Sequence, residues 1–389
     1  MRQHITQLAG AADKVGIRCC QPAGPLTNGS FVWLGTSTGG HLPKLLTVIG
    51  ARPQFIKAAP VSQAFREAGI QELLIHTGQH FDAMMSDVFF EELGIPAPAY
   101  NLEVNNLGHG AMTGRMLEKL EAVMIETRPD MVLIYGDTNS TVAGALAAAK
   151  LNIPLAHVEA GLRSFNRRMP EEINRIVADH LSALLFCPTT TAVSNLEAEG
   201  IRRGVHAVGD VMFDTTLSAV RRARDRSNIL QRLSLQPKTY AVATIHRAEN
   251  TDDPERFSQI MSWLERAAGN SPVIWPTHPR TRSLMSRTGI HPRGVTLVEP
   301  LGYLDMAWLV NNCTAVFTDS GGLQKEAYFH QVPCVTLRDE TEWVETIDAG
   351  WTRLWTSDHY ARRKPITDYG DGNAASGIAK LVTRFFVGA

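Results

Sequence analysis

Residues 131–138 read Met-Val-Leu-Ile-Tyr-Gly-Asp-Thr. The run from Met131 to Tyr135 is apolar without a break, which is the pattern of a parallel strand buried on both faces. An Ala-rich stretch at 142–150 follows it and predicts a helix. A buried strand that leads into a helix is the repeating unit of an α/β fold, so this stretch indicates the fold class.

Strands and helices of the same kind alternate on both sides of this stretch. Before residue 215, strands are predicted at 45–49, 73–76, 154–158, 183–186 and 205–208, and helices at 53–65, 84–93, 112–126 and 171–181. After a polar stretch at 221–238, strands resume at 240–245, 272–276, 295–298, 315–318 and 333–337. The pattern predicts two doubly wound, Rossmann-like α/β domains, 44–215 and 239–370, and a helix at 371–389. We expect the two sheets to face a cleft at the carboxyl ends of their strands, where ligands bind.

The composition excludes several classes of protein. The chain has 389 residues, which suits about two domains. Its 38 Lys and Arg residues balance 39 Asp and Glu residues, which argues against a protein that coats nucleic acid or an anionic membrane. With 44% hydrophobic and 20% charged residues, disorder over most of the chain is excluded. No apolar stretch approaches the length of about 18 residues that spans a bilayer.

The cysteines and the first residues bear on the compartment. The five cysteines are odd in number and scattered without a C-x-x-C pair, which excludes a disulfide framework and a thiolate zinc site. Reduced thiols and the lack of a secretory signal pattern predict a cytoplasmic protein. Residues 1–43 mix Gly, Ser and Thr without a sustained period, and we expect them to form an appended, weakly ordered segment.

Charged side chains follow the predicted strands of the first half, at the edge where α/β sheets bind ligands. Arg52 and Lys57 lie near the start of the helix that follows the strand 45–49. They form either an anion site or a pair of solvated cations. Asp137 follows the strand 131–135 and is either a helix cap or a functional carboxylate.

Three glutamates extend this set. Glu159 follows the strand 154–158, where partial burial would raise the pKa of its carboxyl toward the range useful in acid–base catalysis. Glu171 and Glu172 open a helix, where a favourable interaction with the helix dipole is the alternative to a catalytic role.

The second half contains one strong candidate for a phosphate site. Ser320-Gly321-Gly322 lies between a strand and a helix, where a hydroxyl and backbone N–H groups can approach an anion. Glu326 lies about one turn into that helix and suits the hydroxyls of a ribose, while Arg338 adds a positive charge. His246 directly follows the strand 240–245 and lies next to Arg247 in the sequence. It is an acid–base group, an electrostatic clamp or a structural histidine.

Two other site types are disfavoured. His76 and His80 form an H-x-x-x-H pair, but the pair spans a strand end and Gly78 rather than a helix. No cluster of Cys and His joins it, so we expect no metal site. G-x-G-x-x-G is absent, which weakens any interpretation as an NAD enzyme.

These motifs, in this order, resemble those of the non-hydrolysing UDP-N-acetylglucosamine 2-epimerases over about residues 44–385. The stretches that carry the resemblance are Gly50-Ala51-Arg52-Pro53 with Lys57, Thr77-Gly78-Gln79-His80, Gly136-Asp137-Thr138, His157 to Arg163, Pro170 to Arg175, His246 to Asn250, and Thr318 to Gly322. The resemblance implies a GT-B-like fold with a UDP-sugar in the cleft. It implies an isomerase that needs no metal or NAD and works as a homodimer, without nucleic-acid or membrane partners.

The resemblance also implies a reaction and residue roles. UDP leaves C1 of the sugar, a 2-acetamidoglucal forms, and UDP adds back with the C2 proton on the other face. By motif match, the catalytic residues are Asp137, Glu159, Glu171 and His246. The matched substrate-binding residues are Arg52, Lys57, Leu301, Met306, Ser320, Gly321, Gly322, Glu326 and Arg338. Gln79 and His80 match a second, activating UDP-sugar site of some members. The match does not assign which carboxylate removes the proton and which returns it.

Two stretches depart from the common bacterial enzyme and leave the substrate open. Residues 164–169 and 338–345 resemble the branch that acts on UDP-sugars such as UDP-2,3-diacetamido glucuronic acid. Arg167 and Arg168 either pair with a uronate carboxylate or form a solvated loop. The competing functions are a glycosyltransferase of the same fold, a hydrolysing epimerase and a catalytically silent UDP-sugar sensor.

Overall fold

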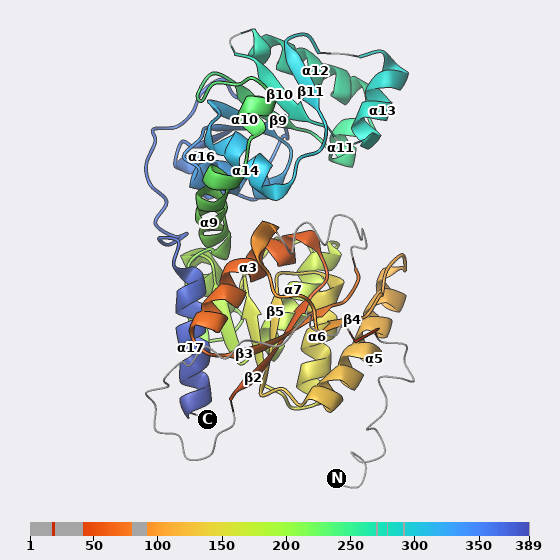
Figure 1. Cartoon of the computed structure of the whole chain (residues 1–389), viewed down its shortest axis with the longest axis vertical. Helices are drawn as coiled ribbons and strands as arrows, with labels where there is room; N and C mark the ends of the chain where they lie inside the picture. Colours follow the sequence, from red (N-terminus) through yellow and green to blue (C-terminus); the bar gives the residue numbers. More distant parts are fainter. Residues whose placement is uncertain are drawn as a thin grey trace. The chain divides into compact units, whose positions relative to one another are not determined.

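The computed structural model describes residues 18–19, 42–79, 92–269, 271–277, 279–290 and 292–388. The chain divides into two compact units: unit 1 is Met1–Asp214 with Asp368–Ala389, and unit 2 is Thr215–Thr367. Each unit is built on its own largely parallel sheet covered by helices (Figure 1). The predicted fold class, two α/β domains with parallel sheets, is confirmed.

Unit 1 contains a sheet whose order is β1-β4-β3-β2-β5-β6-β7-β8. Its strands are β1 (Arg18–Cys19), β2 (Lys44–Ile49), β3 (Gln71–His76), β4 (Tyr100–Asn101), β5 (Met131–Tyr135), β6 (Leu155–Val158), β7 (Leu184–Cys187) and β8 (Val205–Ala207). Its helices are α3 (Arg52–Glu67), α5 (His109–Thr127), α6 (Asn139–Lys150), α7 (Pro170–Leu181), α8 (Thr190–Ala198) and α17 (Ala374–Gly388). The strands from β2 to β8 pair in parallel, whereas β1 pairs antiparallel with β4.

Some sequence expectations fall at the limits of what is described. Within the segment 1–43, Arg18 and Cys19 form the edge strand β1, and residues 1–17 and 20–41 lie outside the described residues. Most of the helix expected at 84–93 also lies outside them. The C-terminal helix expected at 371–389 corresponds to α17, which belongs to unit 1 and packs along α3 (Figure 1).

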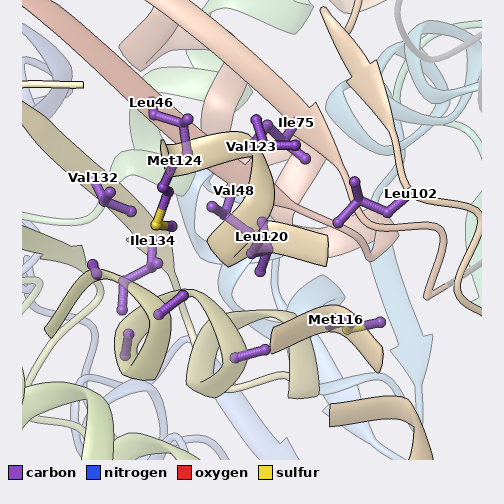
Figure 2. Packing of buried hydrophobic residues seen from close by; sticks show 14 of the residues in the cluster. Leu46, Val48, Ile75, Leu102, Met116, Leu120, Val123, Met124, Val132 and Ile134 are labelled. Atoms are coloured by element: carbon purple, nitrogen blue, oxygen red, sulfur yellow. The ribbon is translucent and has the colours of Figure 1, made fainter. Parts of the chain in front are cut away.

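The core of unit 1 explains why its central strands are apolar without a break. Leu46 and Val48 of β2 lie beside Val132 and Ile134 of β5, and all four are 0% exposed. They pack against α5 and α6, as Figure 2 shows. The residues that alternate with them, such as Leu45, are equally buried on the opposite side of the sheet. Because both faces are covered, the positions in these strands are almost all apolar, and the one buried polar side chain at the centre of β2, Thr47, donates a hydrogen bond to Glu72.

Unit 2 contains a parallel sheet of order β11-β10-β9-β12-β13-β14. Its strands are β9 (Ala241–Thr244), β10 (Val273–Pro276), β11 (Val295–Val298), β12 (Ala315–Thr318), β13 (Cys334–Thr336) and β14 (Thr352–Leu354). Its helices are α10 (Ile229–Arg232), α11 (Ala248–Thr251), α12 (Pro254–Ala268), α13 (Pro279–Thr288), α14 (Tyr303–Asn311), α15 (Gly321–Phe329) and α16 (Val344–Asp348). The helix α9 (Val211–Arg226) carries the chain from unit 1 into unit 2.

Both sheets share a topological feature that locates ligand sites. The chain builds outward from β2 through β3 to β4, then returns and continues from β5 on the other side of β2. In unit 2 it builds outward from β9 to β11 and returns to β12 beside β9. Loops on the two sides of such a switch point diverge and leave room for a ligand at the carboxyl ends of the strands. Among the described residues, no helix has both the length and the apolarity needed to cross a membrane.

A buried carboxylate anchors α17 in unit 1. The side chain of Asp214 accepts hydrogen bonds from the backbone N–H groups of Ala374 and Ala375, at 3.2 and 2.9 Å. Asp214 is 8% exposed, and this burial raises the pKa of its carboxyl to about 6 although the two hydrogen bonds lower it. The first turn of α17 is thus held by a group that titrates near neutral pH.

We expect Asp214→Asn to remove a pH dependence of stability. The folded-state pKa of about 6 lies above the ordinary value of 3.8, so the folded protein binds this proton more tightly than the unfolded chain. Its contribution is therefore present below pH 4 and lost as the pH rises through 6, by up to about 3 kcal/mol. Urea unfolding at pH 4.5 and 7.5 should show the free energy of unfolding of the wild type falling relative to that of Asp214→Asn.

The matched control is Asp225→Asn, at an exposed position on α9. It should leave the pH dependence of the wild type unchanged. An equal pH dependence in the wild type and Asp214→Asn would contradict the assignment to Asp214.

Candidate functional site

In unit 1, one buried side chain joins the two turns at the switch point. Gln54 of α3 is 2% exposed, and its Oε1 accepts hydrogen bonds from the N–H groups of Gly50 and Ala51, at 2.8 and 3.0 Å. Its Nε2 donates to the carbonyl of Tyr135 at 2.8 Å and lies 3.1 Å from the hydroxyl of Thr138. The turn after β2 and the turn after β5 are therefore fixed to each other.

An ion pair lies beside the two turns that Gln54 connects. Lys57 of α3 forms an ion pair with Glu159, which follows β6, and the two side chains are only 13% and 10% exposed. A Cβ atom added to Gly136, in the turn after β5, would lie 3.3 Å from Glu159 Oε2 and 3.9 Å from Lys57 Nζ. Glu159 has a φ of 73°, a left-handed conformation that is strained for a residue with a Cβ atom. The ion pair thus lies directly against the turn that carries Asp137.

Asp137 itself is held by α7. Its Oδ2 accepts from Arg175 Nε at 3.0 Å and from Nη2 at 2.7 Å, and its carbonyl accepts from Asn174 Nδ2 at 2.8 Å. The N-cap of α6 is Thr138, whose hydroxyl accepts from Thr141 N. Asp137 therefore does not serve as the cap and remains a partly exposed carboxylate paired with an arginine.

The two glutamates at the start of α7 have different surroundings. Glu172 is 1% exposed and accepts from the N–H groups of Ser164 and Phe165 and from Arg175 Nη1. Burial alone would raise the pKa of its carboxyl, but these hydrogen bonds outweigh burial and lower the pKa. Glu171 is exposed and lies four residues before Arg175, on the same helix face as the partner of Asp137.

In unit 2, a buried side chain likewise connects the two turns at the switch point of the sheet. Asp319, which follows β12, is 0% exposed and accepts from the backbone N–H groups of His246 and Arg247, each at 3.0 Å, and from Asn250 Nδ2 at 3.0 Å. The His246 ring is 54% exposed, with Nδ1 3.4 Å from Asp319 Oδ1. The turn after β9 is thereby fixed to the turn after β12, and the His246 ring is left accessible.

Helix α15 begins directly after Asp319. Ser320 is its N-cap and accepts from Leu323 N at 3.5 Å, and Gly321 and Gly322 form the first turn. The carboxylate of Glu342 lies against Gly321, where a Cβ atom would collide with it. Glu342 in turn accepts from Arg338 Nη1 at 2.7 Å. Burial raises the pKa of the Glu342 carboxyl, but hydrogen bonds and the Arg338 charge lower it overall, so an anion already lies at this helix terminus.

Arg338 and three other expected binding residues of unit 2 have defined places. The Arg338 side chain is 11% exposed, and its Nε also lies 3.2 Å from Glu249 Oε1. Leu301 and Met306 are half-buried and pack against the core that lies beneath α14 and α15. Glu326 is half-buried within α15.

The remaining candidates lie in unit 1. Arg52 is exposed at the first residue of α3. Gln79 Oε1 accepts from the N–H and the hydroxyl of Ser140, at 3.1 and 2.8 Å, and so holds the first turn of α6. His80 lies outside the described residues, and the expected activating role of Gln79 and His80 stays a prediction. Within the described ranges, no group of three or more His, Cys, Asp or Glu residues is placed to hold a metal ion.

Sequence reasoning missed the residues that hold the candidates in place. Gln54 and Arg175 lie inside stretches that the motifs include, and Asp319 directly follows a predicted strand. A strand-end position was a usable signal for Asp319. Gln54 and Arg175 carry no such signal, because their partners are 81 and 38 residues away.

The chain is similar to known proteins over most of its length. A family model described as UDP-N-acetylglucosamine 2-epimerase matches residues 63–383. The UDP-2,3-diacetamido-2,3-dideoxy-D-glucuronate 2-epimerase of Pseudomonas aeruginosa is 49% identical over 358 residues, which are 88% of this chain and 99% of that protein. A UDP-N-acetylglucosamine 2-epimerase of Methanococcus maripaludis is 40% identical over 361 residues, 87% of this chain and 98% of that protein.

A solved structure shows the same likeness. The crystal structure of Methanocaldococcus jannaschii UDP-GlcNAc 2-epimerase, in complex with UDP-GlcNAc and UDP, matches with a TM-score of 0.76 and 37% identity. The match covers 88% of this chain and 99% of that one.

We expect Gln54→Leu to destabilise unit 1 strongly. The substitution replaces the amide by an apolar side chain of similar size and leaves the N–H groups of Gly50 and Ala51 without their partner, at a cost of about 3 kcal/mol. The carbonyl of Tyr135 loses Gln54 but keeps its hydrogen bond from the Thr141 hydroxyl. Urea unfolding measures the loss. The control is Gln63→Leu, an exposed glutamine of the same helix, which should change stability by less than about 0.5 kcal/mol. Equal losses in the two variants would show that the Gln54 contacts contribute nothing.

Proposed function

Because this chain belongs to the UDP-N-acetylglucosamine 2-epimerase family, we propose that it inverts C2 of a UDP-N-acetylhexosamine and interconverts UDP-N-acetylglucosamine and UDP-N-acetylmannosamine. One observation carries the proposal most directly. Asp137 and Glu159 lie beside the switch point of the unit 1 sheet, and each is paired with a cation. A reaction that removes and returns a proton at carbon needs positioned acid–base groups, and carboxylates fixed in this way can serve as those groups.

We assign UDP binding to unit 2. Departure of UDP from C1 develops negative charge on the diphosphate, which backbone N–H groups at a helix N-terminus stabilise. The turn Ser320-Gly321-Gly322 offers that terminus, and Arg338 adds a cation beside it. The Glu342 carboxylate lies where the diphosphate would bind, so binding would move it aside. In this proposal, the Glu326 carboxylate accepts hydrogen bonds from the ribose hydroxyls. Leu301 and Met306 contact the uracil.

We assign the proton transfers to unit 1. Loss of UDP and of the C2 proton gives a 2-acetamidoglucal, and addition of UDP with a proton on the opposite face completes the inversion. Two acid–base groups, one on each face of the sugar ring at C2, are required. Lys57 and Arg175 form ion pairs with Glu159 and Asp137, and these pairs fix the positions of the two carboxylates. Glu171 and His246 are the further acid–base candidates of this proposal, and Arg52 binds substrate.

We expect Asp137→Asn and Glu159→Gln to abolish epimerisation. Each keeps the shape of its side chain but removes the carboxylate, so turnover should fall by about 10² to 10⁴. Proton NMR with UDP-N-acetylglucosamine in D₂O is the measurement: the wild type should form UDP-N-acetylmannosamine with deuterium at C2 and UDP still attached. UDP binding by calorimetry should persist in both variants, and the exposed control Glu197→Gln should remain active.

Other outcomes of this experiment are equally informative. Free sugar with released UDP would indicate hydrolysis instead of epimerisation. Normal turnover in both carboxylate variants would remove Asp137 and Glu159 from the mechanism.

A second substrate is favoured by one comparison. The relative at 49% identity is a UDP-2,3-diacetamido-2,3-dideoxy-D-glucuronate 2-epimerase, whereas a UDP-N-acetylglucosamine 2-epimerase is 40% identical. Arg167 and Arg168 are exposed in the loop before α7, the helix that holds Asp137. We propose that they bind the uronate carboxylate when the sugar is of that class.

The double substitution Arg167→Gln and Arg168→Gln tests this specificity. If these arginines bind a uronate, kcat/KM for the diacetamido uronate should fall about tenfold or more, while kcat/KM for UDP-N-acetylglucosamine changes less than about twofold. The control is Arg202→Gln with Arg203→Gln, an exposed pair after α8, which should alter neither value. Equal losses with both sugars would refute a role in selecting the uronate.

We also propose a cytoplasmic location and a homodimer. Cys187, Cys313 and Cys334 are free and buried, as expected for a reducing compartment. Fractionation of cells and light scattering of the purified protein test the two proposals.

A further inference from the structure

One buried histidine in unit 1 has no part in the reaction as proposed above. His157 lies on β6 and is 0% exposed. Its Nδ1 lies 2.7 Å from Asp179 Oδ1, and its Nε2 lies 2.8 Å from the carbonyl oxygen of Gly136. The ring thus connects α7 to the turn after β5.

The contacts fix how the ring is protonated. The carbonyl of Gly136 can only accept, so Nε2 carries a hydrogen. Burial would raise the pKa of Asp179, but hydrogen bonds and charges from His157 and Arg163 outweigh it and lower the pKa. Asp179 is therefore an anion that can accept from Nδ1. It also accepts from Arg163, which pairs in turn with Glu199.

The bond to Gly136 acts on the turn that presents Asp137. The peptide group between Gly136 and Asp137 is planar, so fixing the Gly136 carbonyl also fixes the direction in which the chain enters Asp137. Gly136 has a φ of 59°, and the Lys57–Glu159 ion pair lies against it. A glycine in this position could rotate without such a restraint.

We propose that His157, supported by Asp179, is a positioning residue that holds Asp137 beside the Lys57–Glu159 ion pair through the Gly136 carbonyl. It acts through Asp137 and does not touch the substrate. The proposal rests on the proposed role of Asp137 in epimerisation.

Two substitutions separate the two bonds of the ring. In His157→Gln, the amide of the new side chain reaches about as far as Nε2 did, so it can keep the bond to Gly136 and loses that to Asp179. In His157→Asn, the shorter amide reaches only to the place of Nδ1, so it keeps the bond to Asp179 and loses that to Gly136. Both variants should unfold at a lower temperature than the wild type, His157→Gln at least as much, because it removes one of the buried partners of the Asp179 carboxylate, which keeps only Arg163 and the Gly161 N–H.

Activity should follow the opposite order. We expect kcat of His157→Gln within about threefold of the wild type, and kcat of His157→Asn lower by about 30-fold or more with KM nearly unchanged, because misplacing a catalytic group lowers the rate. A destabilised control, Val123→Ala in the core beneath α5, should lower the melting temperature and leave kcat intact. Equal kcat in the two His157 variants, or kcat that follows the melting temperature, would overturn the proposal.

Hydrogen–deuterium exchange gives a measurement that does not depend on the substrate. Exchange at residues 136–141 should be faster in His157→Asn than in His157→Gln, and the reverse order would overturn the proposal. An inactive wild type with the expected exchange order would refute the proposed function while supporting the restraint on Gly136. An active wild type with the reverse order would refute the role of His157 alone.

Discussion

A buried polar side chain joins the two turns at the switch point of each sheet, and both candidate sites depend on it. Gln54 does this in unit 1 and Asp319 in unit 2. Turns at a switch point diverge, so the β ladder cannot hold them together, and their backbone groups need other partners. One side chain that satisfies both turns fixes the distance between them. This connection positions the candidate residues in or next to the turns. They are Lys57 and Asp137 in unit 1, and His246 and Ser320 in unit 2.

The choice of side chain reflects what each pair of turns offers. In unit 1 one turn presents N–H groups and the other a carbonyl, and an amide both accepts and donates. In unit 2 Asp319 meets only donors, from His246, Arg247 and Asn250, and a carboxylate accepts them all. The buried carboxyl group of Asp319 therefore has hydrogen-bond partners, as burial of a polar group requires. Each unit thus connects its two turns with a side chain whose hydrogen-bond donors and acceptors match the groups of those turns.

The sequence predicted the parts of the fold that depend on local pattern. The apolar runs such as Met131 to Tyr135 indicated the strands, because strands buried on both faces have few polar positions. The strand ends indicated Asp137 and Glu159, because topology places such residues at one edge of the sheet. The edge strand at Arg18–Cys19 was not predicted, since two residues carry no period. Gln54 and His157 were missed because their roles depend on partners distant in sequence.

The return of the chain to unit 1 through α17 has a consequence for synthesis. Unit 2 is inserted between residues 214 and 368 of unit 1. The half that carries Asp137 and Glu159 therefore begins to be made first and is completed last, when α17 leaves the ribosome and can pack on α3. Throughout that interval, the surface of α3 that α17 covers is open to other partners. Chaperones that act on the nascent chain would meet this surface, while every residue of unit 2 has already been joined to the chain.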